Sequence, residues 1–102
     1  MLYICGEYVC DPTKLRTGPI NYALERGGKI WVLEHRYYGE SQVIPPYRDG
    51  WSTANMKWLS AKQALADINE FIGYANGLLN STAKPNWLVV GGSYPGALAG
   101  WF

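Results

Sequence analysis

Three short runs of apolar and aromatic residues limit the fold of this chain more than any other feature. The runs are Leu2–Cys5, Ile30–Leu33 and Trp87–Val90. A strand with one face in water alternates apolar and polar residues, whereas a strand buried on both faces does not. Uninterrupted apolar strands are typical of parallel sheets, in which helices join successive strands and cover both faces. The sequence therefore predicts an α/β fold with three parallel strands.

Helical patterns follow each of these runs, as a parallel sheet requires. The sequence predicts a helix that starts at Pro19 and ends before Gly27, one that follows a capping box at Ser60 and continues to Leu79, and one that starts at Pro95. The segments 6–18 and 35–58 are predicted to be loops, and the second is long enough to have a functional role.

The composition is that of a folded protein and excludes several function classes. The chain has 102 residues, which allow one domain at most, and 48% of them are apolar. A formal net charge of +1 gives no electrostatic basis for binding nucleic acid or an anionic membrane surface. No apolar run approaches the roughly 18 residues of a membrane span. The first residues lack the basic region of a signal peptide. The oligomeric state is left open.

A sheet of three parallel strands would have two unpaired edges and too few helices to cover it. At this length only about 60–68% of the surface of the unfolded chain could be buried. The last helical segment stops after two turns, at Phe102. We therefore expect residues 1–102 to be a piece of one larger α/β domain.

Two cysteines and one glycosylation sequence bear on the compartment of the protein. Cys5 and Cys10 are too few for a disulfide framework or a four-ligand zinc site, so we expect no bound metal. Two semi-buried thiols and one local bridge are both compatible with their spacing. Asn80 begins an Asn-Ser-Thr sequence that would accept an N-linked glycan on the secretory route.

The segment 89–98 carries the most chemical information. A buried strand runs directly into a helix, with Ser93 at the corner among small residues, and this is the context of a nucleophile elbow. Such a corner strains the serine backbone and lifts the hydroxyl above the carboxyl edge of the sheet. The free amide of Tyr94, at the start of the helix, would donate to a developing oxyanion.

The match to the elbow pattern G-x-S-x-G is imperfect, because Pro95 occupies its last position and Gly96 follows. Proline is allowed in the first helical turn, so the elbow can still form. The other interpretation is a glycine-rich turn that binds phosphate or packs tightly. Neither the dinucleotide fingerprint G-x-G-x-x-G nor the lysine of a P-loop is present, so we predict no cofactor and favour the nucleophile.

A catalytic serine needs a base and an acid that orients the base. His35 is the only histidine, but it precedes the serine, whereas the chain order in elbow hydrolases is serine, acid, histidine. We therefore interpret His35 as a hydrogen-bonded structural residue, and Glu34 and Arg36 as an ion pair that anchors the following loop. The acid and the base would then lie beyond Phe102.

The second oxyanion donor of such folds comes from the loop after an earlier strand. In this chain that loop begins at Gly6 and Glu7. A glycine at position 6 would let a substrate approach the backbone closely. The presence of Gly6 is explained equally well if it only ends the strand.

Several blocks of the sequence resemble a known family of serine exopeptidases, which includes lysosomal Pro-Xaa carboxypeptidase, dipeptidyl peptidase II and thymus-specific serine protease. Besides the first strand and its loop, the blocks are E-H-R-Y-Y-G at 34–39, L-S-A-K-Q-A-L-A-D at 59–67 and G-G-S-Y-P-G at 91–96. The resemblance covers nearly the whole chain. Cys10 and the loop as far as Gly18 follow no pattern that we can assign to the family.

The resemblance implies a partial α/β-hydrolase fold that ends just after the elbow, with the cap domain and the second half of the catalytic domain absent from this chain. It implies hydrolysis of peptides through an acyl-enzyme on Ser93, with Tyr94 as one oxyanion donor and the loop with Gly6 and Glu7 as the other. It also implies carboxypeptidase or dipeptidyl-peptidase cleavage near proline, in a lysosomal or secreted protein glycosylated at Asn80.

Two other functions stay open at this point. An esterase or lipase can use the same scaffold, because the elbow does not determine the leaving group. The chain could also be a truncated, non-catalytic product, because it holds no base that would activate Ser93. For the same reason we expect the isolated chain to be inactive.

Overall fold

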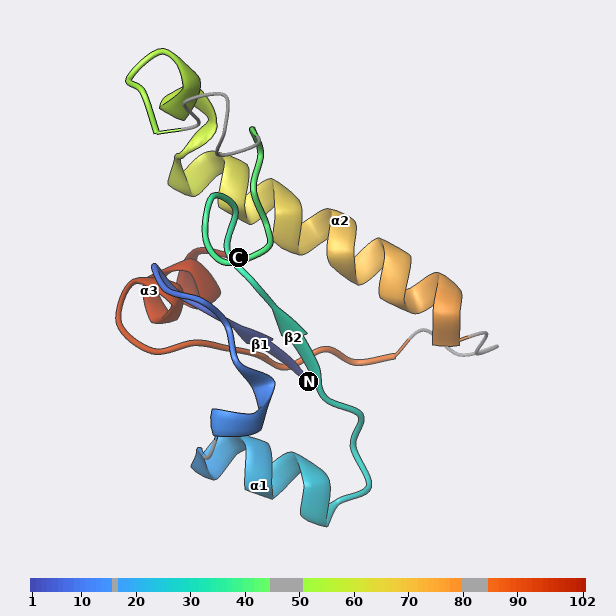
Figure 1. The fold of residues 1–102 in the computed structure, drawn as a ribbon. Coiled ribbons are helices and arrows are strands. Elements are labelled where there is room, and N and C mark those ends of the chain that lie inside the picture. The colour runs from blue at the N-terminus through green and yellow to red at the C-terminus, as the bar shows by residue number, and fades with distance from the viewer. Residues whose placement is uncertain (16, 45–50, 80–84) are drawn as a thin grey trace.

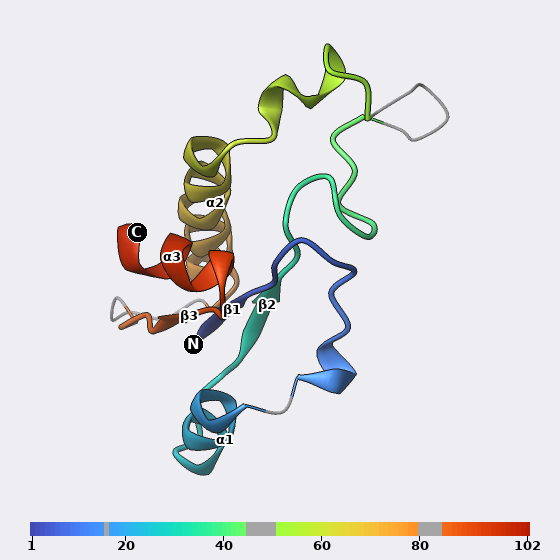
Figure 2. The ribbon, with the colours of Figure 1, turned by 90° about the vertical axis from the view of Figure 1, so that its left-hand side faces the viewer.

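The computed structural model describes most of the chain, namely residues 1–15, 17–44, 51–79 and 85–102. Figure 1 shows the fold as a ribbon. Three strands form one parallel sheet in the order β2-β1-β3 (Figure 2), and they are β1 (Leu2–Ile4), β2 (Trp31–Leu33) and β3 (Val89–Val90). In the central strand, Tyr3 pairs with Val32 on one side and with Val90 on the other. The predicted fold of three parallel strands is confirmed, although each strand is one or two residues shorter than its apolar run.

One helix follows each strand, as predicted, and the helices are α1 (Gly18–Glu25), α2 (Ala61–Leu79) and α3 (Tyr94–Trp101). The start of α2 shows the expected cap, because the Gln63 amide donates to the Ser60 hydroxyl at 3.3 Å. After α1, Gly27 takes a φ of +68°, a conformation that glycine adopts without steric cost.

Single-turn 3-10 helices lie in the described parts of the two segments predicted to be loops, and they are η1 (Pro12–Lys14) and η3 (Asn55–Trp58). The side chain of Asp11 accepts the Thr13 amide at 3.0 Å and so starts η1. The carbonyl of Asn55, in η3, accepts the hydroxyl of Tyr37 at 2.6 Å. One turn is too short to produce a periodic pattern, so neither element could be recognised from apolar spacing.

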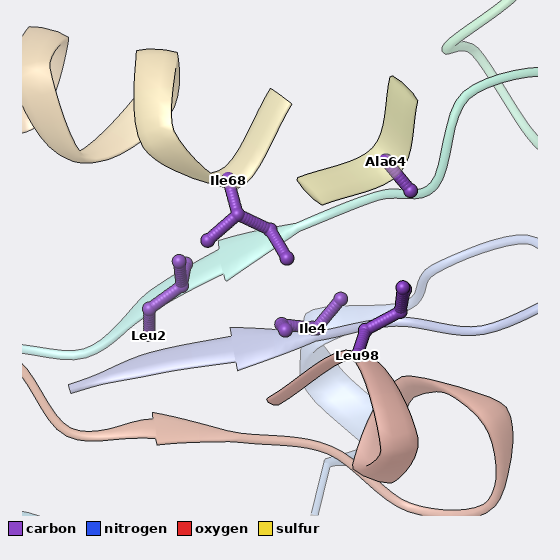
Figure 3. Packing of buried hydrophobic residues seen from close by; sticks show 5 residues of the cluster. All are labelled: Leu2, Ile4, Ala64, Ile68 and Leu98. Carbon is purple, nitrogen blue, oxygen red and sulfur yellow. The ribbon is translucent and has the colours of Figure 1, made fainter. Parts of the chain in front are cut away.

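The side chains of β1 alternate between two cores, one on each face of the sheet. Leu2 and Ile4 pack with residues of α2 and α3, namely Ala64, Ile68 and Leu98 (Figure 3). Tyr3 and Cys5 point to the other face and pack with Ile20 of α1. Figure 2 accordingly shows α1 on one side of the sheet and α2 on the other. Because both faces are covered, every position of the strand is apolar or aromatic.

Large apolar side chains remain uncovered on the surface of all three helices and beside β3. Those that are more than half exposed include Tyr22, Leu24, Tyr74, Leu78, Leu88 and Trp101. Isolated apolar residues are normal on a protein surface, but these large side chains lie around a sheet whose outer strands, among the described residues, pair only with β1. Among the described helices, none combines the length and the hydropathy that are required to cross a bilayer.

Candidate active site

Ser93 lies at the sharp corner between β3 and α3. Its backbone has φ +58° and ψ −129°, a sparsely populated conformation that costs about 1–3 kcal/mol in a residue with a side chain. The residue is exposed, and its carbonyl accepts the first helical hydrogen bond from the Ala97 amide at 3.1 Å. The strained corner expected from the sequence is therefore present, and its serine lies outside the packed core.

The chain passes itself very closely at this corner. A Cβ atom on Gly91 would lie 2.5 Å from the backbone carbon and oxygen of Pro95. Only glycine, which has no Cβ atom, avoids this collision. A Cβ atom on Gly92 would have no neighbour within 4 Å. Pro95 itself is buried, and its Cγ lies 3.1 Å from the place where a Cβ of Gly6 would be. Proline thus fits the last position of the elbow pattern, because its ring fills space beneath the loop after β1.

The same packing places the loop after β1 against the first turn of α3. Gly6 is buried and touches Pro95, while Glu7 is exposed. A cavity of about 200 Å³ lies here, and its lining includes Glu7, Tyr38, Ser60 and Tyr94. The first amides of a helix have no partner within the helix, so the Tyr94 amide is available at this edge of the sheet. The structure therefore brings Gly6 and Glu7 beside the turn that carries Ser93 and Tyr94.

His35 is buried next to the elbow, with only 5% of its surface exposed. Its Nδ1 lies 2.8 Å from the Arg36 carbonyl, and its Nε2 lies 3.2 Å from the Tyr94 hydroxyl. His35 is thus hydrogen-bonded through both ring nitrogens, as expected from the sequence. Burial raises the pKa of Tyr94, and the negative charge of Glu7 adds to the rise, so this hydroxyl keeps its proton.

The prediction that Glu34 and Arg36 form an ion pair with each other is wrong. Arg36 instead forms a bidentate pair with Asp67 of α2, in which Nε and Nη2 each donate to a carboxylate oxygen at 2.6 Å. Its Nη1 donates to the Trp58 carbonyl at 3.0 Å. These hydrogen bonds to Asp67 raise the pKa of the guanidinium. Because the chain turns after β2, the two side chains reach different segments of the molecule.

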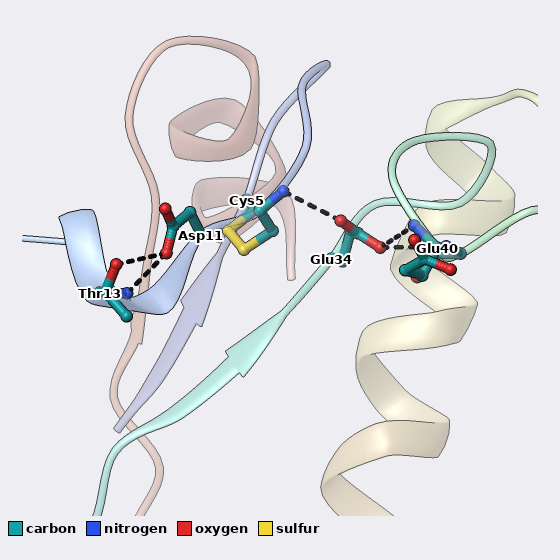
Figure 4. The surroundings of a disulfide bond; sticks show 7 residues. Cys5, Asp11, Thr13, Glu34 and Glu40 are labelled. Carbon is teal, nitrogen blue, oxygen red and sulfur yellow. Dashed lines mark hydrogen bonds between the residues drawn. A yellow bond between two sulfur atoms is a disulfide. The ribbon is translucent and has the colours of Figure 1, made fainter.

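Glu34 binds backbone amides. Its carboxylate accepts hydrogen bonds from Cys10 at 2.9 Å, from Glu40 at 2.9 Å and from Ser41 at 3.0 Å (Figure 4). Burial alone would raise the pKa of Glu34, but these hydrogen bonds outweigh burial and lower it. Gly39 has a φ of +51°, and a Cβ atom there would collide with the Glu34 carboxylate.

Cys5 and Cys10 form a disulfide, with their Cα atoms 5.8 Å apart (Figure 4). Of the two interpretations compatible with their spacing, the local bridge is therefore the one observed. It closes the short loop that holds Gly6 and Glu7. Since the Cys10 amide is also bound by Glu34, this loop is fastened at its far end by two independent contacts.

Two tyrosines of the E-H-R-Y-Y-G block were not singled out by the sequence analysis. Tyr37 is 1% exposed with a φ of +70°, and Tyr38 packs its ring against His35 with centroids 5.6 Å apart. An aromatic pair in a polar segment has no periodic signal, so only its place inside the block could have suggested a role. The predicted glycosylation site at Asn80 lies outside the described residues.

A strained, exposed serine between a parallel strand and a helix is the arrangement of the serine hydrolases with an α/β-hydrolase fold. Comparison with protein families is more specific, because the model of the family described as serine carboxypeptidase S28 matches residues 1–102. The chain belongs to this family of serine peptidases.

Individual relatives agree with this assignment. The chain is 37% identical to the thymus-specific serine protease of Mus musculus, over 98% of this chain and 19% of that protein. It is 40% identical to the lysosomal Pro-X carboxypeptidase of Bos taurus, over 78% of this chain and 16% of that protein. The chain thus spans one fifth or less of the length of these two relatives. No solved structure gives a significant match.

Proposed function

We propose that the chain is part of the catalytic domain of a serine-type exopeptidase. In this proposal Ser93 is the nucleophile and the Tyr94 amide is one oxyanion donor. The loop with Gly6 and Glu7 supplies the second donor. The uncovered apolar surface and the fraction of the relatives that the chain spans both support a larger domain. The rest of that domain would include the cap.

The observation that carries the proposal is the residue type at the corner. A turn that only packed tightly or bound phosphate would place glycine where φ is +58°, because glycine adopts this conformation without cost. Glycine is available one position earlier, at Gly92, yet Ser93 takes the strained position. Backbone strain that glycine would relieve, but that the protein retains in a serine, is typical of functional sites. The hydroxyl is also left free of a capping bond to its own helix.

The chemistry follows that of acyl-enzyme hydrolases. The Ser93 oxygen attacks the scissile carbonyl while a general base takes its proton, and the Tyr94 amide stabilises the oxyanion that forms. The amine leaves with the proton held by the base, and water then hydrolyses the acyl-enzyme. His35 is poorly suited to be the base, because both of its ring nitrogens already have partners. The base and its acid therefore come from residues outside this chain.

The substrates are peptides cleaved near proline, by removal of either a C-terminal residue or an N-terminal dipeptide. The name of one relative, lysosomal Pro-X carboxypeptidase, supports the first mode and a lysosomal or secreted location. The disulfide supports the same location, since disulfides persist mainly in oxidising compartments. Asn80 would carry a glycan there.

The proposal is tested on the complete protein that contains this chain. We expect a fluorophosphonate probe to label the wild-type protein and Ser93→Ala to abolish labelling and turnover without changing the unfolding temperature. Continued labelling of the variant would remove Ser93 from the mechanism. The isolated chain serves as a second test, because without a base we expect its labelling to be negligible.

The substrate class is tested with matched compounds. A peptide with proline before its C-terminal residue, a peptide with proline as its second residue and a short-chain ester are compared by kcat/KM. We expect one of the two peptides to be preferred, and the preferred peptide identifies the cleavage mode. A preference for the ester over both peptides would show an esterase instead.

A further inference from the structure

Three consecutive residues after β2 reach three different parts of the site. Glu34 binds the amide of Cys10 at the end of the disulfide loop, and Arg36 binds Asp67 of α2. Between them, His35 reaches Tyr94, the residue that follows the candidate nucleophile and lies 59 positions away in the sequence. The first and last of these contacts fasten the scaffold, whereas the middle one reaches the elbow itself.

The polarity of the His35 contacts can be assigned. The Arg36 carbonyl can only accept a hydrogen bond, so Nδ1 of His35 carries a proton and donates it. In the neutral ring Nε2 is then an acceptor, and the Tyr94 hydroxyl donates to it. The backbone of the turn after β2 thus fixes the orientation of the imidazole, and the imidazole fixes the tyrosine side chain.

The first turn of α3 lacks the contact that usually holds the start of a helix. An N-cap serine normally accepts an amide of the first turn through its hydroxyl, and loss of such a cap costs about 1 kcal/mol. The Ser93 side chain makes no such bond, which leaves the hydroxyl free for chemistry. Pro95 also has no amide to donate. Besides the packing of the buried Pro95 ring, the hydrogen bond between Tyr94 and His35 is a side-chain contact that holds this turn in place.

We propose that His35 is a positioning residue, which holds the Tyr94 side chain and thereby keeps the Tyr94 amide directed at the oxyanion that develops next to Ser93. The inference rests on the proposed function, because it assigns a supporting residue to the same oxyanion site. It also explains why the E-H-R-Y-Y-G and G-G-S-Y-P-G blocks occur together, since their side chains are hydrogen-bonded to each other.

Two substitutions of His35 separate the contact with Tyr94 from the other roles of the ring. His35→Gln retains an acceptor near the position of Nε2, whereas His35→Asn retains only a donor near Nδ1 for the Arg36 carbonyl. Tyr94→Phe removes the hydroxyl and keeps the ring, and it is a milder change if the His35 variants fold poorly. Tyr22→Phe is the control, because it makes the same chemical change on an exposed ring of α1, and α1 packs on the face of the sheet opposite to α3.

The readouts on the complete protein are the rate of fluorophosphonate labelling, kcat and KM. Loss of a whole oxyanion donor costs about 100- to 1,000-fold in kcat, so a misdirected donor is expected to cost about tenfold. We expect His35→Asn and Tyr94→Phe each to lower kcat and labelling by this amount with little change in KM. The double variant should be no slower than the slower single variant. His35→Gln should remain within about threefold of wild type, and Tyr22→Phe should be unchanged.

Wild-type rates in folded His35→Asn and Tyr94→Phe would overturn this inference while leaving the proposed function intact. Equal losses in His35→Gln and His35→Asn would also overturn it, because the acceptor for Tyr94 would then not matter. A wild-type protein that is never labelled would instead refute the proposed function, and this inference with it.

Discussion

Gly91 is the position where the elbow can be tested most sharply. In Gly91→Ala the new Cβ atom would lie 2.5 Å from the Pro95 backbone, whereas ordinary contacts begin at 3.4 Å. The two segments must therefore separate by about 0.9 Å, the difference between these distances. Backbone atoms in a packed turn do not move as easily as the end of a side chain, so we expect a loss of about 1–3 kcal/mol in the free energy of unfolding.

The same movement shifts the serine and the oxyanion amide relative to each other. A misplacement of about 1 Å in an active site can cost about 100-fold in rate, and we expect fluorophosphonate labelling of Gly91→Ala to slow by this order. Labelling rates and urea unfolding of the complete protein measure the two effects separately. Gly92→Ala is the matched control, because its Cβ atom meets nothing within 4 Å and its stability should change by less than about 1 kcal/mol.

The comparison between the two alanine variants decides whether the reasoning holds. If Gly91→Ala and Gly92→Ala have the same stability and the same labelling rate, the close approach at the corner has no energetic consequence. The account of the strained elbow would then be wrong, whatever the chemistry of the serine.

Three further predictions concern the contacts around the site. Replacing Cys5 and Cys10 by serine removes a short loop closure, which should lower the free energy of unfolding by about 2 kcal/mol and slow labelling, and unchanged values would show that the bridge is dispensable. Glu34 has a lowered pKa, so its contribution to stability is present above its ordinary value of 4.5 and is lost as the pH falls through the lowered value. The difference in unfolding free energy between wild type and Glu34→Gln should therefore shrink in acid, and a constant difference would contradict this. Asp67→Asn should destabilise by about 1 kcal/mol in low salt and by less in 1 M salt, because Asp67 is 39% exposed and its pair with Arg36 is partly screened.

The parts of the fold that could be predicted are those with a local signal. The strand around Tyr3 is apolar at every position because both faces of the sheet are covered, and α2 shows helical spacing along its whole length. The corner at Ser93 could also be recognised, because a strand, small residues and a helix follow each other within ten positions. These local patterns can be recognised without knowing which distant segments are in contact in the fold.

The parts that were missed depend on contacts between distant segments. Arg36 and Asp67 are 31 positions apart, and Glu34 and Cys10 are 24 positions apart, so nothing in the sequence near Glu34 indicated these partners. The charges of neighbours suggested an ion pair between Glu34 and Arg36, but tertiary geometry decided otherwise. The positive φ of Tyr37 has no sequence signal either, because it is imposed by the buried turn around it.

The central place of β1 has a consequence for how the protein is made. Leu2 pairs with Val89, which emerges from the ribosome 87 residues later (89 − 2). At about 5–20 residues per second this delay lasts on the order of 4–17 s, during which one edge of β1 has no partner. Of the segments described, the corner with the serine is thus completed last, and a chaperone that shields the open edge until then should raise the yield of newly synthesised protein.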